Sequence, residues 1–70
     1  MRRVLVLHMT DQMLTITQVA ELLQVPVETM RKWRAQNSGP QAIKLGRHVR
    51  YRPEDVDRWV QEQASEQARR

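Results

Sequence analysis

The sequence of 70 residues contains no cysteine and no phenylalanine, and it has only two glycines. Without cysteine, neither a disulfide nor a thiolate metal site is available to stabilise so small a chain. One domain of this length rarely gains more than about 3–5 kcal/mol of net stability from its own core, and it leaves little room for a catalytic cleft. We therefore expect a single domain that is stabilised further by a partner or by copies of itself.

Long hydrophobic runs are also missing. The apolar run nearest the N-terminus covers only residues 4–7. A secretory signal needs about 7–15 apolar residues, and a membrane-spanning helix needs about 20. We therefore expect a soluble, cytoplasmic protein with no membrane partner.

Acidic residues are absent from the middle of the chain. No Asp or Glu lies between residues 29 and 53, whereas the same stretch holds seven Lys and Arg. The rest of the chain carries five basic and eight acidic residues, so the net charge of +4 combines a block of +7 with a remainder of −3. Such a block is typical of a surface that binds the phosphate backbone of nucleic acid, although ordinary solvated surface is also charged.

The first part of the chain predicts a short helix. Thr17 is a candidate N-cap, and Val19, Leu22 and Leu23 follow the i, i+3, i+4 spacing of one buried stripe. Residues 24–26 then interrupt this pattern, and the proline among them breaks the helix.

A second helix is predicted over about residues 26–36, with Pro26 in its first turn. At 100° per residue, Met30 and Trp33 share one side of this helix, and its mostly basic residues lie opposite. Two short helices joined by a three-residue break indicate a helix-turn-helix.

Residues 42–52 alternate between apolar and basic side chains, which predicts two short strands. Paired residues in a hairpin point to the same face. A three-residue turn over residues 46–48 pairs Leu45 with Val49 and Ile43 with Tyr51, so that all four face the core. The side chains expected outward or at the tip are basic: Lys44, Arg47, His48, Arg50 and Arg52. A basic hairpin in this position is a wing.

A third helix is predicted from Pro53, which suits a first helical position. Its apolar stripe is expected to cover the hairpin and the first two helices; it comprises Val56, Trp59, Val60 and Ala64. Glu54 and Arg58 are spaced to form an i, i+4 ion pair.

The ordered set of segments 14–23, 25–26, 29–33, 44–47 and 51–60 resembles the winged helix-turn-helix of the phage excisionase family, which is related to MerR-like DNA-binding domains. The sequence departs from many relatives at Gln24 and Pro26, where they carry glycine and serine. The fold class expected is mainly α with a small β-hairpin. Residues 1–13 are then an N-terminal arm or short strand, residues 14–62 the domain, and residues 63–70 a polar C-terminal tail.

The resemblance implies a function. Excisionases are recombination directionality factors: they bind attachment-site double-stranded DNA in the bacterial host, often as neighbouring copies, bend it, and direct a phage integrase towards excision. They perform no chemistry. Similar small proteins are transcription regulators that bind operator DNA, and a third reading is an adaptor that docks on an acidic protein.

The second helix is expected to contact DNA through residues of its outward face and flanks, namely Glu28, Thr29, Arg31, Lys32, Arg34 and Gln36. Arg31 and Lys32 are placed for phosphates or guanine in the major groove, and Arg34 and Gln36 for the DNA backbone. Glu28 and Thr29 lie at the helix start, where base edges are reached. Glu28 either accepts from cytosine N4 or only complements the helix dipole.

In the hairpin, Arg47 is the residue expected in the minor groove, where a narrow groove concentrates negative potential. Phosphate contacts are expected from Lys44, Arg50 and Arg52. His48 is either a pH-dependent contact or a plain polar residue of the tip.

The aromatic residues Trp33, Tyr51 and Trp59 have the spacing of core residues rather than of base-stacking residues. Two histidines forty residues apart, without cysteine, make no metal site. Paired carboxylates, an activated nucleophile and a glycine-rich phosphate loop are not evident in the sequence. We therefore expect a protein that is not an enzyme and has no cofactor.

Overall fold

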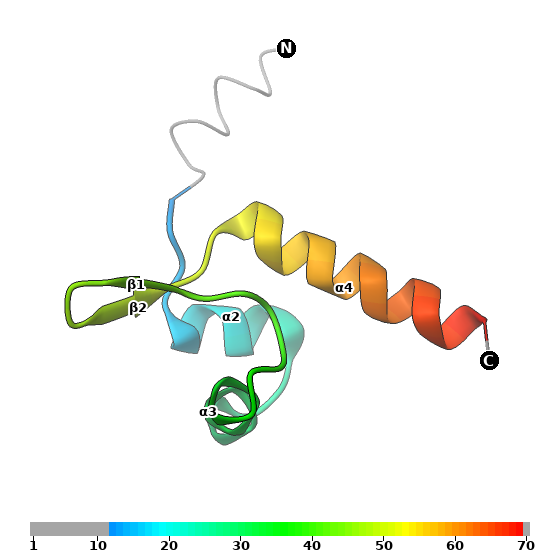
Figure 1. The fold of residues 1–70 in the computed structure, drawn as a ribbon, viewed down its shortest axis with the longest axis horizontal. Coiled ribbons are helices and arrows are strands. Elements are labelled where there is room, and N and C mark those ends of the chain that lie inside the picture. The colour runs from blue at the N-terminus through cyan, green and yellow to red at the C-terminus, as the bar shows by residue number, and fades with distance from the viewer. Residues whose placement is uncertain (1–11, 70) are drawn as a thin grey trace, which may run out of the picture.

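The computed structural model describes residues 12–69. These residues form, in order, α2 (Ile16–Leu23), α3 (Val27–Ala35), β1 (Ile43–Leu45), β2 (His48–Arg50) and α4 (Pro53–Ala68). The two strands form an antiparallel hairpin that projects from one side of the helices (Figure 1). This is a mainly helical winged helix-turn-helix, as the sequence predicts. The arm or strand expected in residues 1–13 lies outside the described residues, apart from its last two positions.

Helix α2 begins earlier than expected because Thr15, not Thr17, is its N-cap. The Thr15 hydroxyl accepts a hydrogen bond of 3.1 Å from the Gln18 N–H, and the Gln18 side chain accepts one of 2.8 Å from the Thr15 N–H. This reciprocal capping box satisfies two N–H groups at once, which a cap at Thr17 would not do. The helix ends at Leu23, and its C-cap, Gln24, has a left-handed φ of 58°. That conformation is one that glycine adopts readily.

The three-residue connection before α3 is confirmed, with a shift of one residue at its end. Pro26 is the N-cap of α3 rather than a residue of its first turn, and its carbonyl accepts from the N–H groups of Thr29 and Met30. Because its backbone is extended, with a φ of −65° and a ψ of 149°, Pro26 stands just outside the helix and α3 begins at Val27.

The core is small and is built from helices α2, α3 and α4 and from the residue that follows β2. Its buried hydrophobic residues are Val19, Ala20, Met30, Tyr51 and Val56. Tyr51 is also held by the chain before α2, because Leu14 and Tyr51 exchange two backbone hydrogen bonds of 2.8 Å. This bridge ties the end of the wing to the start of the helix-turn-helix.

Two half-buried tryptophans extend this core, as the sequence predicts. The rings of Trp33 on α3 and Trp59 on α4 are 5.2 Å apart between centroids, at 49°. Gly39, with a φ of 80°, lies so close that a Cβ there would stand 2.9 Å from the Trp33 Cβ. The loop after α3 therefore packs directly on Trp33, and only glycine fits both the space and the backbone conformation.

The predicted register of the wing is wrong by one residue in the turn. The observed pairs are Ile43 with Arg50, Lys44 with Val49 and Leu45 with His48. The turn therefore has two residues, Gly46 and Arg47, and Gly46 has a φ of 67°. Glycine with positive φ in the first of two turn positions is the signature of a type II′ turn, which matches the twist of a hairpin.

This register divides the hairpin differently from the prediction. Val49 and Tyr51 do pack on the core. Ile43 and Leu45, which were expected to face the core with them, lie instead on the opposite face together with Arg50. Leu45 is correspondingly 47% exposed.

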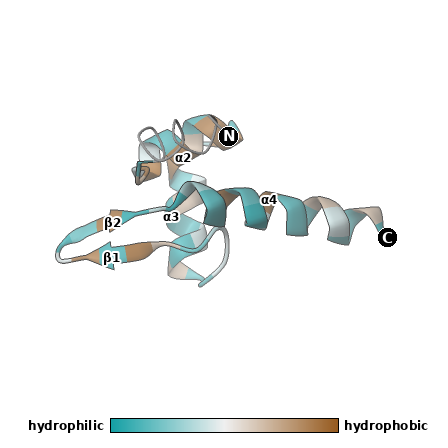
Figure 2. Cartoon of the chain, turned by 90° about the horizontal axis from the view of Figure 1, so that it is seen from above, coloured by the Kyte–Doolittle hydropathy of each residue, from teal (hydrophilic) through white to brown (hydrophobic). Residues whose placement is uncertain are grey.

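Helix α4 starts at Pro53 as predicted, but only the beginning of its apolar stripe is covered. Val56 is buried, Val60 is 36% exposed, and Ala64 is exposed. The helix also runs on to Ala68, through most of the segment expected to be a polar tail, and it projects beyond α2 and α3 (Figures 1 and 2). No helix among residues 12–69 has the length and apolar character that a membrane crossing requires.

Candidate nucleic-acid interface

Helix α3 presents its basic residues to solvent, since Arg31, Lys32 and Arg34 are all exposed. The helix is held from beneath by buried Met30 and half-buried Trp33, so its opposite surface faces outward. Glu28 lies in the first turn, where a carboxylate complements the helix dipole, and accepts a hydrogen bond of 3.0 Å from Arg31. The Arg31 and Glu28 side chains are 59% and 82% exposed. An ion pair this exposed contributes little stability, so Arg31 can leave Glu28 for another partner at little cost.

The two remaining candidates on α3 are less prominent. Thr29 is half-buried. Gln36 lies one residue beyond the helix as its C-cap, where its backbone N–H donates to the carbonyls of Lys32 and Trp33. Its side chain is exposed, at the end of the basic surface.

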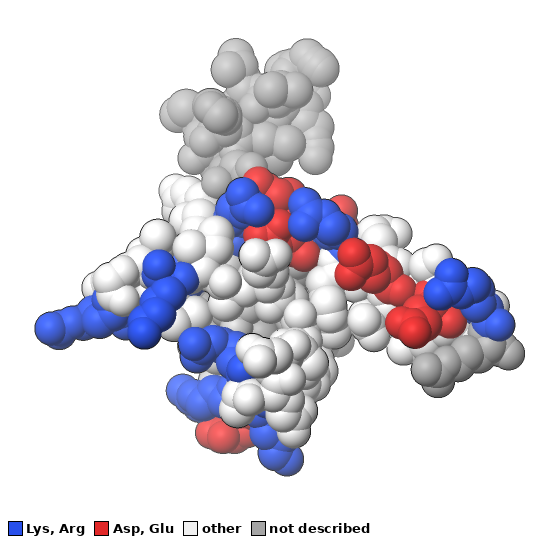
Figure 3. Space-filling view, in the orientation of Figure 1, with Lys and Arg blue, Asp and Glu red and all other residues white. Residues whose placement is uncertain are grey.

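The wing brings a second group of basic residues to the surface. Lys44, Arg47 and His48 are exposed, and Arg50 is half-buried, with its guanidinium donating 2.8 Å to the Val49 carbonyl. Figure 3 shows Lys and Arg side chains of the wing and of α3 on the same side of the molecule, with a concave gap between them. Two projecting basic elements separated by a gap are arranged to hold one extended, negatively charged partner.

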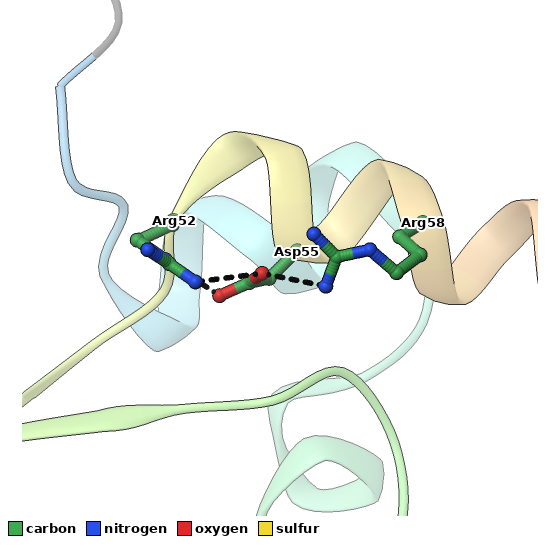
Figure 4. Close-up of polar contacts among 3 residues, drawn as sticks. All are labelled: Arg52, Asp55 and Arg58. Carbon is green, nitrogen blue, oxygen red and sulfur yellow. Dashed lines mark hydrogen bonds and ion pairs between the residues drawn. The ribbon is translucent and has the colours of Figure 1, made fainter.

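Arg52 has a different environment from the other predicted contact residues. Its guanidinium donates two hydrogen bonds, of 2.8 and 3.1 Å, to Asp55, and Arg58 donates a third of 3.0 Å (Figure 4). The Asp55 side chain is completely buried. The predicted pair between Glu54 and Arg58 is wrong, because Arg58 turns to this buried carboxylate instead.

Asp55, which anchors Arg52 and Arg58, was not predicted from the sequence. Hydrogen bonding to Arg52 is the main cause that holds the pKa of Asp55 below its usual value, helped by Arg58 and opposed by burial. The i, i+3 spacing of Arg52, Asp55 and Arg58 was the available signal. It indicates one helix face, but it does not show that the carboxylate is buried.

Tyr51 is the other buried polar residue at this junction. Its hydroxyl has no hydrogen-bond partner among residues 12–69. Burial raises the pKa of Tyr51, and the positive charge of Arg34 acts against that rise. Tyr51 therefore packs in the core, within reach of the positive charge of Arg34.

Residues 12–69 contain no group of three or more His, Cys, Asp or Glu side chains close enough to hold a metal ion. Two groups of charged residues stand out instead: the exposed basic residues of α3 and the wing, and the three residues joined at Asp55.

A family model described as a helix-turn-helix domain matches residues 13–64. The match runs from the capping segment of α2 through α3 and the wing to the exposed part of α4. No curated protein and no solved structure matches the chain.

Proposed function

The chain belongs to this family of helix-turn-helix domains, whose fold points to DNA binding, and we propose that it is an excisionase-type protein. In this proposal it binds and bends attachment-site DNA, beside neighbouring copies of itself, and directs a phage integrase towards prophage excision. It performs no chemistry and needs no cofactor. The observation that carries the proposal is the exposed basic surface that α3 and the wing share.

In this proposal α3 enters the major groove, which is wide enough to admit a helix. Arg31 and Lys32 then reach guanine edges or phosphates, and the weak surface pair between Glu28 and Arg31 opens when Arg31 meets DNA. The wing follows the adjacent backbone and places Arg47 at the minor groove. Between them, the two elements neutralise several phosphates.

Binding is tested with a duplex selected from a random DNA pool by the purified protein. Replacing Arg31 or Lys32 by alanine is expected to weaken binding about tenfold or more and to reduce the salt slope by about one. The matched control is Arg69→Ala, which removes an exposed positive charge at the C-cap of α4. Equal affinity of all three variants would reject the groove-facing role of α3 and favour the adaptor reading.

Bending and recombination are tested separately. The selected site is placed at several positions in one DNA fragment, and the mobility of the complex is compared. Mobility that depends on position supports bending, whereas a single shift independent of position contradicts it. The excision role then requires that the protein stimulate excision by a phage integrase on attachment-site DNA and that Arg31→Ala abolish this stimulation.

One observation supports a second candidate, a prophage transcription regulator. The outer half of α4 projects from the domain and exposes Val60 and Ala64 on one stripe. An apolar stripe of this kind can pair two copies on an inverted repeat, as a dimeric repressor requires. Selected sites that are inverted repeats, without any bend, would favour this candidate.

A further inference from the structure

The outer face of the wing is not purely basic. The observed register places Ile43 and Leu45 on the face that points away from the core, and neither residue belongs to the set that packs on the core. Leu45 is the outermost of the two and immediately precedes the turn. It is 47% exposed although it is one of the larger aliphatic side chains.

The surroundings of Leu45 carry positive charge only. His48 is its cross-strand partner, Arg50 lies on the same face, and Arg47 follows in the turn, whereas Lys44 points to the opposite face. No acidic residue occurs between positions 29 and 53. Figure 2 shows hydrophobic residues on a hairpin that stands clear of the helices. An apolar side chain framed by cations suits an occupant with a negative rim and an apolar interior.

The minor groove of duplex DNA has that composition, because phosphates line its edges and stacked bases form its floor. DNA-bending proteins commonly insert leucine, isoleucine or another apolar side chain between base steps of the minor groove, which unstacks the step and kinks the duplex.

The shape of the wing tip favours insertion. The turn is only two residues long, and a Cβ placed on Gly46 would meet no atom within 4 Å. The turn is therefore open to solvent at Gly46, and Arg47, the other turn residue, is exposed.

We propose that Leu45 is an apolar wedge that enters the minor groove and partly unstacks one base step, while Arg47 in the turn and Arg50 on the same face hold nearby phosphates. This inference rests on the proposed DNA-binding function and identifies the residue that bends the DNA. Basic residues then supply affinity, and Leu45 supplies the deformation.

The test compares Leu45→Ala with Leu22→Ala. Leu22 is also an exposed leucine, at 62%, but it lies on α2 away from the wing. The probe is the duplex selected by the wild-type protein, labelled at its ends to report the bend by energy transfer. In a second version, 2-aminopurine replaces an adenine at each step of the wing site, so that unstacking raises its fluorescence.

We expect Leu45→Ala to bind the duplex with nearly the wild-type affinity, to lose about half of the bend or more, and to abolish the 2-aminopurine signal. Leu45→Met, which keeps a long apolar side chain, should restore both signals, and Leu22→Ala should leave both unchanged. Leu45 lies outside the core, so the unfolding midpoint of Leu45→Ala should match that of the wild type, which excludes misfolding as the cause.

The experiment distinguishes failure of the wedge from failure of the proposed DNA-binding function. If the wild-type protein does not bind duplex DNA, the proposed function fails and this inference with it. If the wild-type protein binds and Leu45→Ala bends the duplex equally, the wedge is wrong while DNA binding stands. If Leu45→Ala alters only the number of copies bound, Leu45 contacts a neighbouring copy or another protein and the wedge is again wrong.

Discussion

The two arginine-rich regions of this domain use the same side chain for opposite purposes. On α3, Arg31 meets an exposed carboxylate, Glu28, in a pair that solvent surrounds. At the start of α4, Arg52 and Arg58 converge on Asp55, whose side chain is completely buried. The burial of the acid therefore separates arginines available to a partner from arginines committed to the fold. Counting basic residues along the chain does not make that distinction.

The largest effect is expected from removing Asp55, and the matched change at Glu28 should have almost none. Asp55→Ala should lower the free energy of unfolding by about 3 kcal/mol, because it breaks three charge-assisted hydrogen bonds at a buried site. Glu28→Ala should change it by less than about 0.5 kcal/mol. Urea unfolding monitored by tryptophan fluorescence measures both. Equal losses would mean that burial does not distinguish the two regions.

The two glycines provide the next comparison. Gly39→Ala should cost about 2 kcal/mol, because it combines a φ of 80° with a contact of 2.9 Å to Trp33. Gly46→Ala in the wing should cost about 1 kcal/mol, because its φ of 67° is strained but the space around it is open. Thermal unfolding of both variants checks which of the two loses more stability. A wing variant that is the less stable of the two would show that the hairpin turn matters more than the loop on Trp33.

The pH dependence of stability follows from Asp55. Its pKa is lower in the folded protein than the ordinary value of 3.8, so the ionised carboxylate stabilises the fold above that value. This stabilisation should be lost as the pH falls through the lower, folded-state pKa. Thermal melts between about pH 2 and pH 6 should show the loss, and Asp55→Asn should make the curve flatter. An unchanged curve in Asp55→Asn would assign the acid sensitivity to other groups.

The smallest change in stability is expected when Arg52 and Arg50 are compared. Arg52→Ala should lower the melting temperature slightly and leave DNA affinity close to that of the wild type, because Arg52 is bonded to Asp55. Arg50→Ala should instead lower the DNA affinity and leave the melting temperature close to that of the wild type. The prediction from sequence that Arg52 holds a phosphate would be supported instead if the affinity fell equally in both variants.

The elements of the fold were largely predictable from the sequence, because local signals define them. The break at residues 24–26 and the start of α4 at Pro53 depend on proline and on helical periodicity, and both are found where expected. The helix cap was misplaced by two residues, because Thr15 and Thr17 both suit that position and only the partner Gln18 distinguishes them. The basic surface was likewise predictable, whereas the commitment of Arg52 was not.

The sequence by itself determined the type and order of the elements and the separation of positive from negative charge, since both depend on residues close together along the chain. Only the tertiary structure decided the wing register and the burial of Asp55. The register follows from a type II′ turn at Gly46 and from the bridge between Tyr51 and Leu14, which are distant in sequence. The pairing of Leu45 with His48 in this register places Leu45 on the outward face, the face that we propose meets the DNA.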